Sequence, residues 1–154
     1  DPAYSGRRAA VRVVVDASVA VKWVFPDPAV EPPTDRAVAL LERIRNRDVG
    51  VIQPPHWLFE VVAVVVRLSP PVAVPAIALL DALELTTCDD VTVLRRAAEL
   101  AAELRHHLFD TLYHAVALEQ DATLVTADVR YANKAREVGG LCLLRDFAPT
   151  AGAG

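Results

Sequence analysis

The stretch VRVVVDASVAVKW, residues 11–23, decides the fold of this chain. Its first five residues are β-branched apart from Arg12, which predicts a short buried strand. The residues from Ser18 onward have the pattern of a helix. Asp16 therefore follows the carboxyl end of a strand, which is where open α/β sheets bind their ligands.

The same arrangement returns near the other end of the sequence. The stretch ATLVTAD, residues 122–128, predicts a strand that ends just before Asp128, and a helix is expected after it. Two strand ends thus offer two carboxylates to one edge of the predicted sheet.

Between these stretches, strands and helices alternate. We predict strands near 11–15, 50–53, 85–88, 123–126 and 141–144, and helices near 18–25, 34–46, 55–68, 72–83, 91–107, 110–120 and 129–138. Alternation of this kind indicates an α/β fold with a parallel sheet. Two helical stripes are expected to pack on that sheet, namely Ala37, Leu40, Leu41 and Ile44, and Leu94, Ala98, Ala101 and Leu104.

Two more carboxylates stand in unusual contexts. Glu60 lies in the apolar run 57–66, with no salt-bridge partner in that run before Arg67. A buried unpaired carboxylate costs several kcal/mol or raises its pKa, so Glu60 is expected to serve a cation or to face solvent in a cleft. Asp110 opens the predicted helix 110–120, whose first turn would project the carboxylate outwards.

Each acid also has a simpler interpretation. Asp is a favoured N-cap that contributes about 1 kcal/mol, so Asp16, Asp110 and Asp128 could each only begin a helix. Glu60 could be a surface residue beside Arg67. The presence of all four acids in these contexts favours a shared site.

Length and composition set the class of protein. A chain of 154 residues with 53% hydrophobic residues suits one domain, which we place at 11–147, with a flexible arm or extraneous remnant at 1–10 and a flexible tail at 148–154. No apolar stretch approaches the roughly 20 residues that span a bilayer. Cys88 and Cys142 lack paired spacing, which favours reduced thiols and a cytoplasmic setting.

The formal net charge of −4 excludes a protein that holds nucleic acid by bulk electrostatics, so any such contact must be local. Two basic clusters stand out. Arg36, Arg43, Arg45 and Arg47 are expected to form a solvated helix face. The second cluster, Arg130, Lys134 and Arg136, follows Asp128 closely and is better placed to meet phosphate.

Four segments in order carry a specific resemblance, namely 14–23, 55–62, 109–117 and 124–128. Together they resemble a PIN domain of the VapC toxin type, from about Val11 to Phe147. The resemblance implies a three-layer α/β sandwich in which a mostly parallel five-stranded sheet is flanked by about seven helices. It also implies a metal-dependent endoribonuclease toxin that a VapB-type antitoxin neutralises.

Carried onto this sequence, the family pattern makes Asp16, Glu60, Asp110 and Asp128 the acidic site, with the hydroxyls of Ser18 and Thr126 beside it. Cleavage in the family leaves a 5′-phosphate and a 3′-hydroxyl, and we expect the same products here.

Carboxylates are ligands for hard cations, so Mg²⁺ or Mn²⁺ is expected rather than zinc. Either ion would neutralise a phosphodiester and supply a hydroxide. We expect Asp16, Asp110 and Asp128 to hold the principal ion, and Glu60 to complete a second position or to orient the attacking water. His114 departs from the family pattern and is either a further ligand or a satisfied histidine. We have no stronger reason to expect metal binding by His56, His106 or His107.

Two other classes of protein fit less well. A haloacid-dehalogenase-like phosphatase would need a second Asp where Ser18 stands, and a receiver domain would need an acid pair where Val15 and Asp16 stand. The serious alternative is a non-catalytic PIN-like module that binds RNA or protein, although four mutually repelling acids argue against it.

Partners are also expected. The segments 55–68 and 72–83 have more apolar residues than a small sheet needs, so we expect a homodimer or a bound antitoxin helix there. The residues that carry this expectation are Val62, Val65, Val72, Val74, Ile77 and Leu80.

Overall fold

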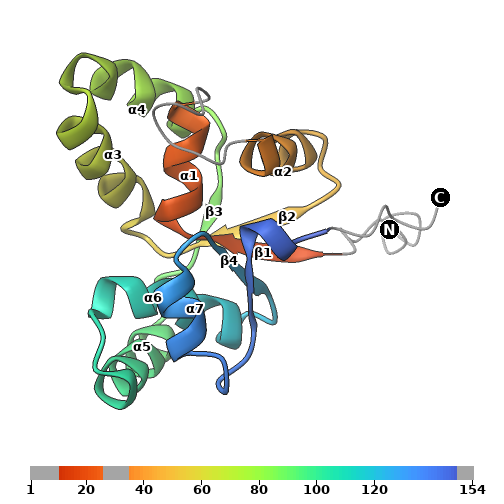
Figure 1. Cartoon of the computed structure of the whole chain (residues 1–154), viewed down its shortest axis with the longest axis vertical. Helices are drawn as coiled ribbons and strands as arrows, with labels where there is room; N and C mark the ends of the chain where they lie inside the picture. The colour runs from red at the N-terminus through yellow and green to blue at the C-terminus, as the bar shows by residue number, and fades with distance from the viewer. Residues whose placement is uncertain (1–10, 26–34, 149–154) are drawn as a thin grey trace.

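The chain forms a five-stranded parallel sheet in the strand order β3-β2-β1-β4-β5 (Figure 1). The computed structural model describes residues 11–25 and 35–148. The strands are β1 (Arg12–Val15), β2 (Gly50–Gln53), β3 (Thr86–Thr87), β4 (Thr123–Thr126) and β5 (Leu141–Leu143). The side chains of Val13, Val14 and Val15 have no exposed surface, as expected for a central strand that is covered on both faces.

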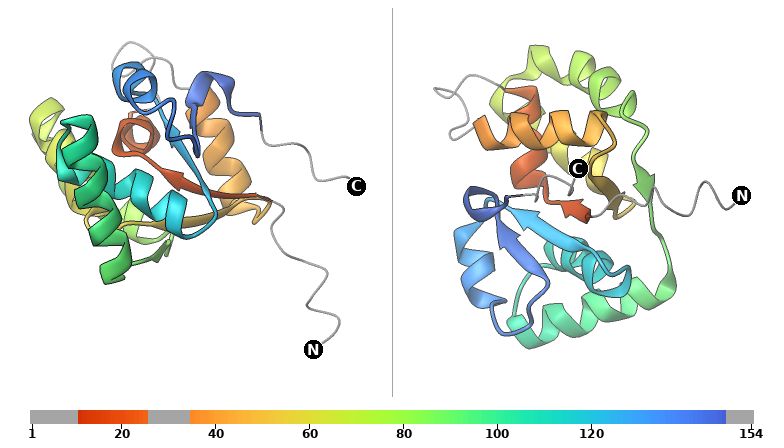
Figure 2. Two further views of the ribbon diagram at one scale, coloured as in Figure 1. Left: turned by 90° about the horizontal axis from the view of Figure 1, so that it is seen from below. Right: turned by 90° about the vertical axis from the view of Figure 1, so that its right-hand side faces the viewer.

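Seven α-helices in the described ranges cover the sheet in two layers (Figures 1 and 2). The helices on one face are α1 (Ala17–Val24), α2 (Asp35–Arg45), α3 (Trp57–Leu68) and α4 (Ala73–Asp81), and those on the other are α5 (Val91–Leu104), α6 (Leu108–Glu119) and α7 (Val129–Lys134). Short 3₁₀ turns occupy Pro70–Val72 and Leu144–Asp146. The predicted three-layer α/β sandwich is therefore confirmed.

The strand order explains why the helices before β3 cover one face of the sheet and the helices after β3 cover the other. From β1 the chain moves outward to β2 and β3, and it then returns to place β4 on the other side of β1. Because parallel crossovers are right-handed, reversing the direction of travel puts the connecting helices on the opposite face. α6 is the innermost of these, and every residue from Thr111 to Ala117 is buried.

Most element boundaries agree with the prediction to within about two residues, and three differences affect the site. α5 ends at Leu104, because Arg105 adopts a left-handed conformation with φ +51° and ψ +54°. α6 begins at Leu108, so Asp110 lies inside the first turn and is not the helix cap. α7 ends at Lys134 rather than at 138.

The predicted packing stripe of α5 was wrong. Its buried residues are Val93, Ala97 and Leu100, while Leu94 is 49% exposed. Both stripes have helical spacing and differ by one residue, which rotates the helix by about 100°. Close packing against α6 decides between them, and that contact is not visible in the α5 sequence alone. The stripe of α2 is confirmed, because Ala37 and Leu40 are buried.

In the parts of the chain that the structure describes, no helix is long and apolar enough to cross a bilayer. Cys88 and Cys142 are free thiols. The predictions for residues 1–10 and 149–154 lie outside the described residues.

Candidate acidic site at the carboxyl edge of the sheet

Two acids follow the neighbouring strands β1 and β4, between which the strand order reverses. Asp16 follows β1 and caps α1 by accepting a hydrogen bond from Ser18 N at 3.2 Å. Asp128 follows β4 by two residues and caps α7 by accepting one from Tyr131 N at 3.0 Å. Because α1 and α7 lie on opposite faces, a crevice opens at this reversal in folds of this kind, and ligands bind there. The capping interpretation is thus correct for both acids, and it leaves one oxygen of each free of the cap.

Buried polar contacts fix the main chain that carries Asp16. The side-chain amide of Gln53 accepts from Val15 N at 2.7 Å and donates to Val15 O at 2.9 Å, and Gln53 has no exposed surface. On the other side, Asp16 N donates to Val125 O at 3.0 Å. The end of β1 is therefore held between β2 and β4, which leaves Asp16 little freedom to move.

The hydroxyls of Ser18 and Thr126 connect the two strand ends. Both donate to Asp16 Oδ2, from distances of 2.5 Å for Ser18 Oγ and 3.3 Å for Thr126 Oγ1. Ser18 Oγ also accepts from Ala127 N at 3.0 Å, and Thr126 Oγ1 accepts from Asp128 N at 3.0 Å. The predicted pair of hydroxyls thus lies between the two acids and ties their backbones together.

Burial raises the pKa of Asp16 from its ordinary value of 3.8 to about 6. Hydrogen bonds from Ser18 act in the opposite direction, while the nearby carboxylates of Glu60 and Asp110 raise the pKa further. The protein therefore holds Asp16 in an environment that disfavours its negative charge, and a cation would remove that penalty.

Glu60 has a neighbour that the sequence analysis missed. His56, four residues earlier and outside the apolar run 57–66, brings Nε2 to within 2.9 Å of Glu60 Oε2. This contact is not a well-formed hydrogen bond, because His56 Nε2 donates to Phe109 O at 2.8 Å. Glu60 Oε2 is consequently buried without a hydrogen-bond donor. His56 Nδ1 is also buried, and it has no hydrogen-bond partner.

Asp110 has the same i, i+4 arrangement on the other face of the sheet. His106 Nε2 lies 2.9 Å from Asp110 Oδ2. His56 is the N-cap of α3 and lies one turn before Glu60, so the i, i+4 spacing could have found this histidine. His106 precedes α6 and its N-cap His107, so its contact with Asp110 arises from the junction between α5 and α6.

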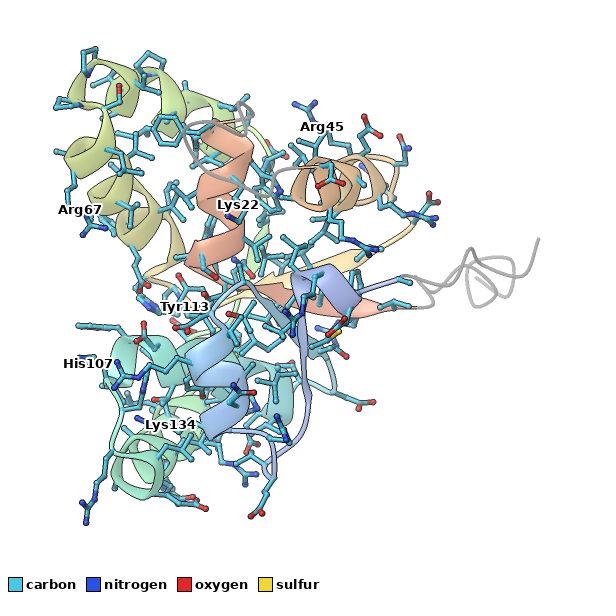
Figure 3. All side chains as sticks on the ribbon, viewed as in Figure 1. Lys22, Arg45, Arg67, His107, Tyr113 and Lys134 are labelled. Carbon is cyan, nitrogen blue, oxygen red and sulfur yellow. The ribbon has the colours of Figure 1, made fainter. Side chains whose placement is uncertain are left out.

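The raised pKa values of two buried tyrosines indicate that the four acids lie in one region. Burial, followed by the carboxylates of Glu60, Asp16 and Asp110, raises the pKa of Tyr113. Burial, followed by Asp16, Asp110 and Asp128, raises the pKa of Tyr131. Tyr113 lies between the base of α1 and α3 and the layer that holds α6 and α7 (Figure 3), and its hydroxyl has no hydrogen-bond partner.

His114 is a satisfied core residue with no exposed surface. Its Nε2 donates to Gly139 O at 2.6 Å, so the neutral ring accepts at Nδ1 from Tyr131 Oη at 2.8 Å. Burial lowers the pKa of His114, which keeps the ring neutral. Both nitrogens are used, and His114 is therefore excluded as a metal ligand in this arrangement.

The structure thus brings Asp16, Glu60, Asp110 and Asp128 to one edge of the sheet, from four different elements. Among the described residues, no three His, Cys, Asp or Glu side chains gather tightly enough to hold a metal ion. The donor set itself fits a hard cation. It consists of carboxylate oxygens, Glu60 Oε2 lacks a donor, and the acids raise the pKa of Asp16.

The fold and these acids define a class of doubly wound α/β protein with an acidic ligand edge. The PIN domain family model matches residues 13–137, and the chain belongs to this family. PIN domains are generally nucleases, and such nucleases generally use divalent metal ions.

The chain is also similar to a solved structure, entitled "Crystal Structure of PAE2754 from Pyrobaculum aerophilum". That match has a TM-score of 0.61 and 16% sequence identity, and it covers 88% of this chain and 91% of the other. At this identity the match shows a shared fold. No curated protein matches the sequence.

Proposed function

We propose that this protein is a metal-dependent endoribonuclease of the VapC toxin type, which hydrolyses RNA phosphodiester bonds and is neutralised by a VapB-type antitoxin. The observation that carries the proposal is the half-buried Asp16, whose pKa is raised to about 6 by burial and by the carboxylates of Glu60 and Asp110 from two other elements. A binding module gains nothing from this repulsion, whereas a metal-dependent hydrolase needs it.

Each acid has a proposed role. Asp16, Asp110 and Asp128 would hold the principal ion, either Mg²⁺ or Mn²⁺, and Glu60 would complete a second position or orient the attacking water. A bound ion of this kind supplies charge neutralisation at the phosphodiester and activates water at neutral pH. Ser18 and Thr126 orient Asp16 through their hydrogen bonds to its Oδ2.

Two of the acids are in contact with histidines. Asp110 Oδ2 contacts His106, and Glu60 Oε2 contacts His56. To bind the ion together with Asp16, either acid would exchange its histidine contact for the metal.

The test is cleavage of end-labelled structured RNAs with Mg²⁺, with Mn²⁺ and with EDTA. Asp110→Asn should abolish discrete cleavage, as should Asp16→Asn, while Asp89→Asn, an exposed acid outside the site, should retain it. Full activity in Asp16→Asn or Asp110→Asn would refute the assignment.

One observation favours a second candidate, a non-catalytic PIN-like module that binds RNA or protein. The described residues form no cluster of three metal donors. Calorimetric titration with Mn²⁺ separates the two candidates, because the nuclease must bind the ion and the module need not. Absence of both metal binding and cleavage would favour the module.

We further propose that α3 and α4 contact a partner, either a second copy of the chain or an antitoxin helix. Val74 is 77% exposed, Leu68 46%, Leu79 43% and Ile77 41%. Two of the residues named from the sequence, Val65 and Leu80, are buried in the core and do not contribute. Large apolar side chains left in water on neighbouring helices are typical of protein interfaces.

A further inference from the structure

A basic pocket adjoins the acidic site on the side of α6 and α7. The pocket has a volume of about 370 Å³, and we name it the Lys134 pocket. It is lined by Ala101, Arg105, His106, His107, Arg130 and Lys134. These residues come from the last turn of α5, the junction between α5 and α6, and α7. Figure 3 shows His107 and Lys134 in the same layer, beyond Tyr113.

The positive charge of the Lys134 pocket is not neutralised by neighbouring acids. Within residues 11–25 and 35–148, no carboxylate forms an ion pair with Arg105, Arg130 or Lys134. The lining of this pocket contains two arginines and a lysine and no Asp or Glu. Such a concentration attracts anions, and arginine in particular binds phosphate oxygens in a bidentate manner.

A chain of polar contacts joins this pocket to the acidic site. Lys134 Nζ lies 3.2 Å from His106 Nδ1, and His106 Nε2 lies 2.9 Å from Asp110 Oδ2. Lysine only donates, so His106 accepts at Nδ1 and a neutral ring must carry its proton on Nε2, which donates to Asp110. His106 therefore belongs to both sites, and a ligand in the Lys134 pocket lies next to Asp110.

A second hydrogen bond holds the Lys134 side chain in place, because its ammonium donates to Arg105 O at 3.3 Å. This bond uses one of its three protons, the contact to His106 uses a second, and one remains for a ligand. The left-handed backbone of Arg105 is what turns its carbonyl into this position.

We infer that the Lys134 pocket binds a phosphate group of the RNA strand next to the scissile one. This inference rests on the proposed ribonuclease function, because the acidic site then holds the scissile phosphate and a neighbouring phosphate lies close by along the strand. Arg105 and Arg130 donate to its oxygens and Lys134 supplies a point charge. The subsite carries no base specificity, and it positions the strand in the manner of other backbone contacts.

The test measures the binding of a fluorescently labelled RNA oligonucleotide by anisotropy in EDTA, where no metal-dependent cleavage occurs, over a series of salt concentrations. The paired substitution Arg130→Gln with Lys134→Gln removes two charges from the pocket. Arg43→Gln with Arg45→Gln removes two from α2 and is the matched control. Figure 3 places Arg45 far from His107 and Lys134.

Each lost phosphate contact lowers the slope of log K against log salt by about 0.7 for a single strand. The pocket pair removes charge from one phosphate contact and should therefore lower the slope by about 0.7 and weaken binding about 5-fold at 0.1 M salt, while the control pair leaves the slope nearly unchanged. Equal effects of the two pairs, or no effect of either, would overturn the inference.

Arg105→Gly separates a binding role from a structural one. Glycine adopts φ +51° readily, so this variant should melt at the same temperature as the parent or higher. It should nevertheless weaken binding, by less than the roughly 5-fold that loss of the whole phosphate contact gives at 0.1 M salt. A weakened binding that accompanies a lower melting temperature would assign Arg105 a structural role and count against the subsite.

Cleavage of the same RNA with Mn²⁺ distinguishes failure of this inference from failure of the proposed function. RNA binding that depends on the pocket, without Mn²⁺ binding and without cleavage, keeps the subsite and rejects the nuclease. Cleavage by a protein whose binding is insensitive to the pocket pair keeps the nuclease and rejects the subsite.

Discussion

Replacing Asp16 by Asn should make the metal-free protein more stable at neutral pH. The carboxylate is half-buried at the end of β1, and burial raises its pKa from 3.8 to about 6. Asn keeps the size of the side chain and accepts the capping hydrogen bond from Ser18 N about as well as Asp does. The substitution therefore removes the buried charge and little else.

The size and pH range of this effect follow from linkage. About two pH units separate the folded and unfolded pKa values, which corresponds to about 3 kcal/mol in the free energy of unfolding. Between pH 3.8 and about 6 the folded state binds more protons than the unfolded chain, so the stability of the wild type falls as the pH rises. The advantage of the Asn variant is thus near zero below pH 4 and complete above pH 6.

The assay is thermal and urea unfolding of both proteins in EDTA at pH 4 and pH 8. At pH 8 the variant should melt roughly 6–12 °C higher for a chain of this size. His114, whose lowered pKa gives the opposite pH dependence, is present in both proteins and cancels in the comparison. Asp89→Asn, at an exposed position, is the control and should change neither value. A variant that is equally stable or less stable than wild type at pH 8 would refute the reasoning.

The remaining predictions concern the metal, the buried tyrosines and the partner surface. Adding Mn²⁺ at about 100 times its dissociation constant should stabilise the wild type by about 2.7 kcal/mol, and Asp16→Asn should respond less, so that the two melting temperatures converge. Tyr113→Phe removes a buried hydroxyl that has no partner and should stabilise the protein by about 1 kcal/mol, whereas Tyr131→Phe leaves His114 Nδ1 without its donor and should destabilise it by about 1–2 kcal/mol in urea unfolding. The same sign for both tyrosines would contradict the contacts described. Val74→Lys should convert a dimer into a monomer in light scattering, while Leu94→Lys on α5 should not, and a wild type that is monomeric at micromolar concentration would remove the self-association proposal.

The sheet was predictable because its signal is local. A run such as Val13 to Val15, β-branched and without charge, is compatible with a strand that is buried on both faces and with few other structures. Asp16 and Asp128 were placed at strand ends by the same logic, since a polar residue that terminates an apolar run must leave the core. The face of α5 was not predictable in this way, because two apolar stripes compete there and only α6 selects one of them.

Predicting which side chains contact the acids required a different sequence pattern. Each histidine was considered alone as a candidate metal ligand, although His56 and His106 both precede an acid by four residues. Both pairs are in contact at 2.9 Å. Helical spacing predicts the contact of His56 with Glu60, whereas that of His106 with Asp110 depends on the junction between α5 and α6.

Tyr113 had no sequence signal of this kind. Its hydroxyl lies near acids from three separate elements, and only the folded sheet brings those together. The same holds for the Lys134 pocket, where Arg105 is separated by 25 residues or more from Arg130 and Lys134. What the sequence displays is therefore the set of residues that end strands and begin helices. Which cations and hydroxyls surround them depends on how the two helical layers meet at the reversal between β1 and β4, and that is a property of the tertiary structure.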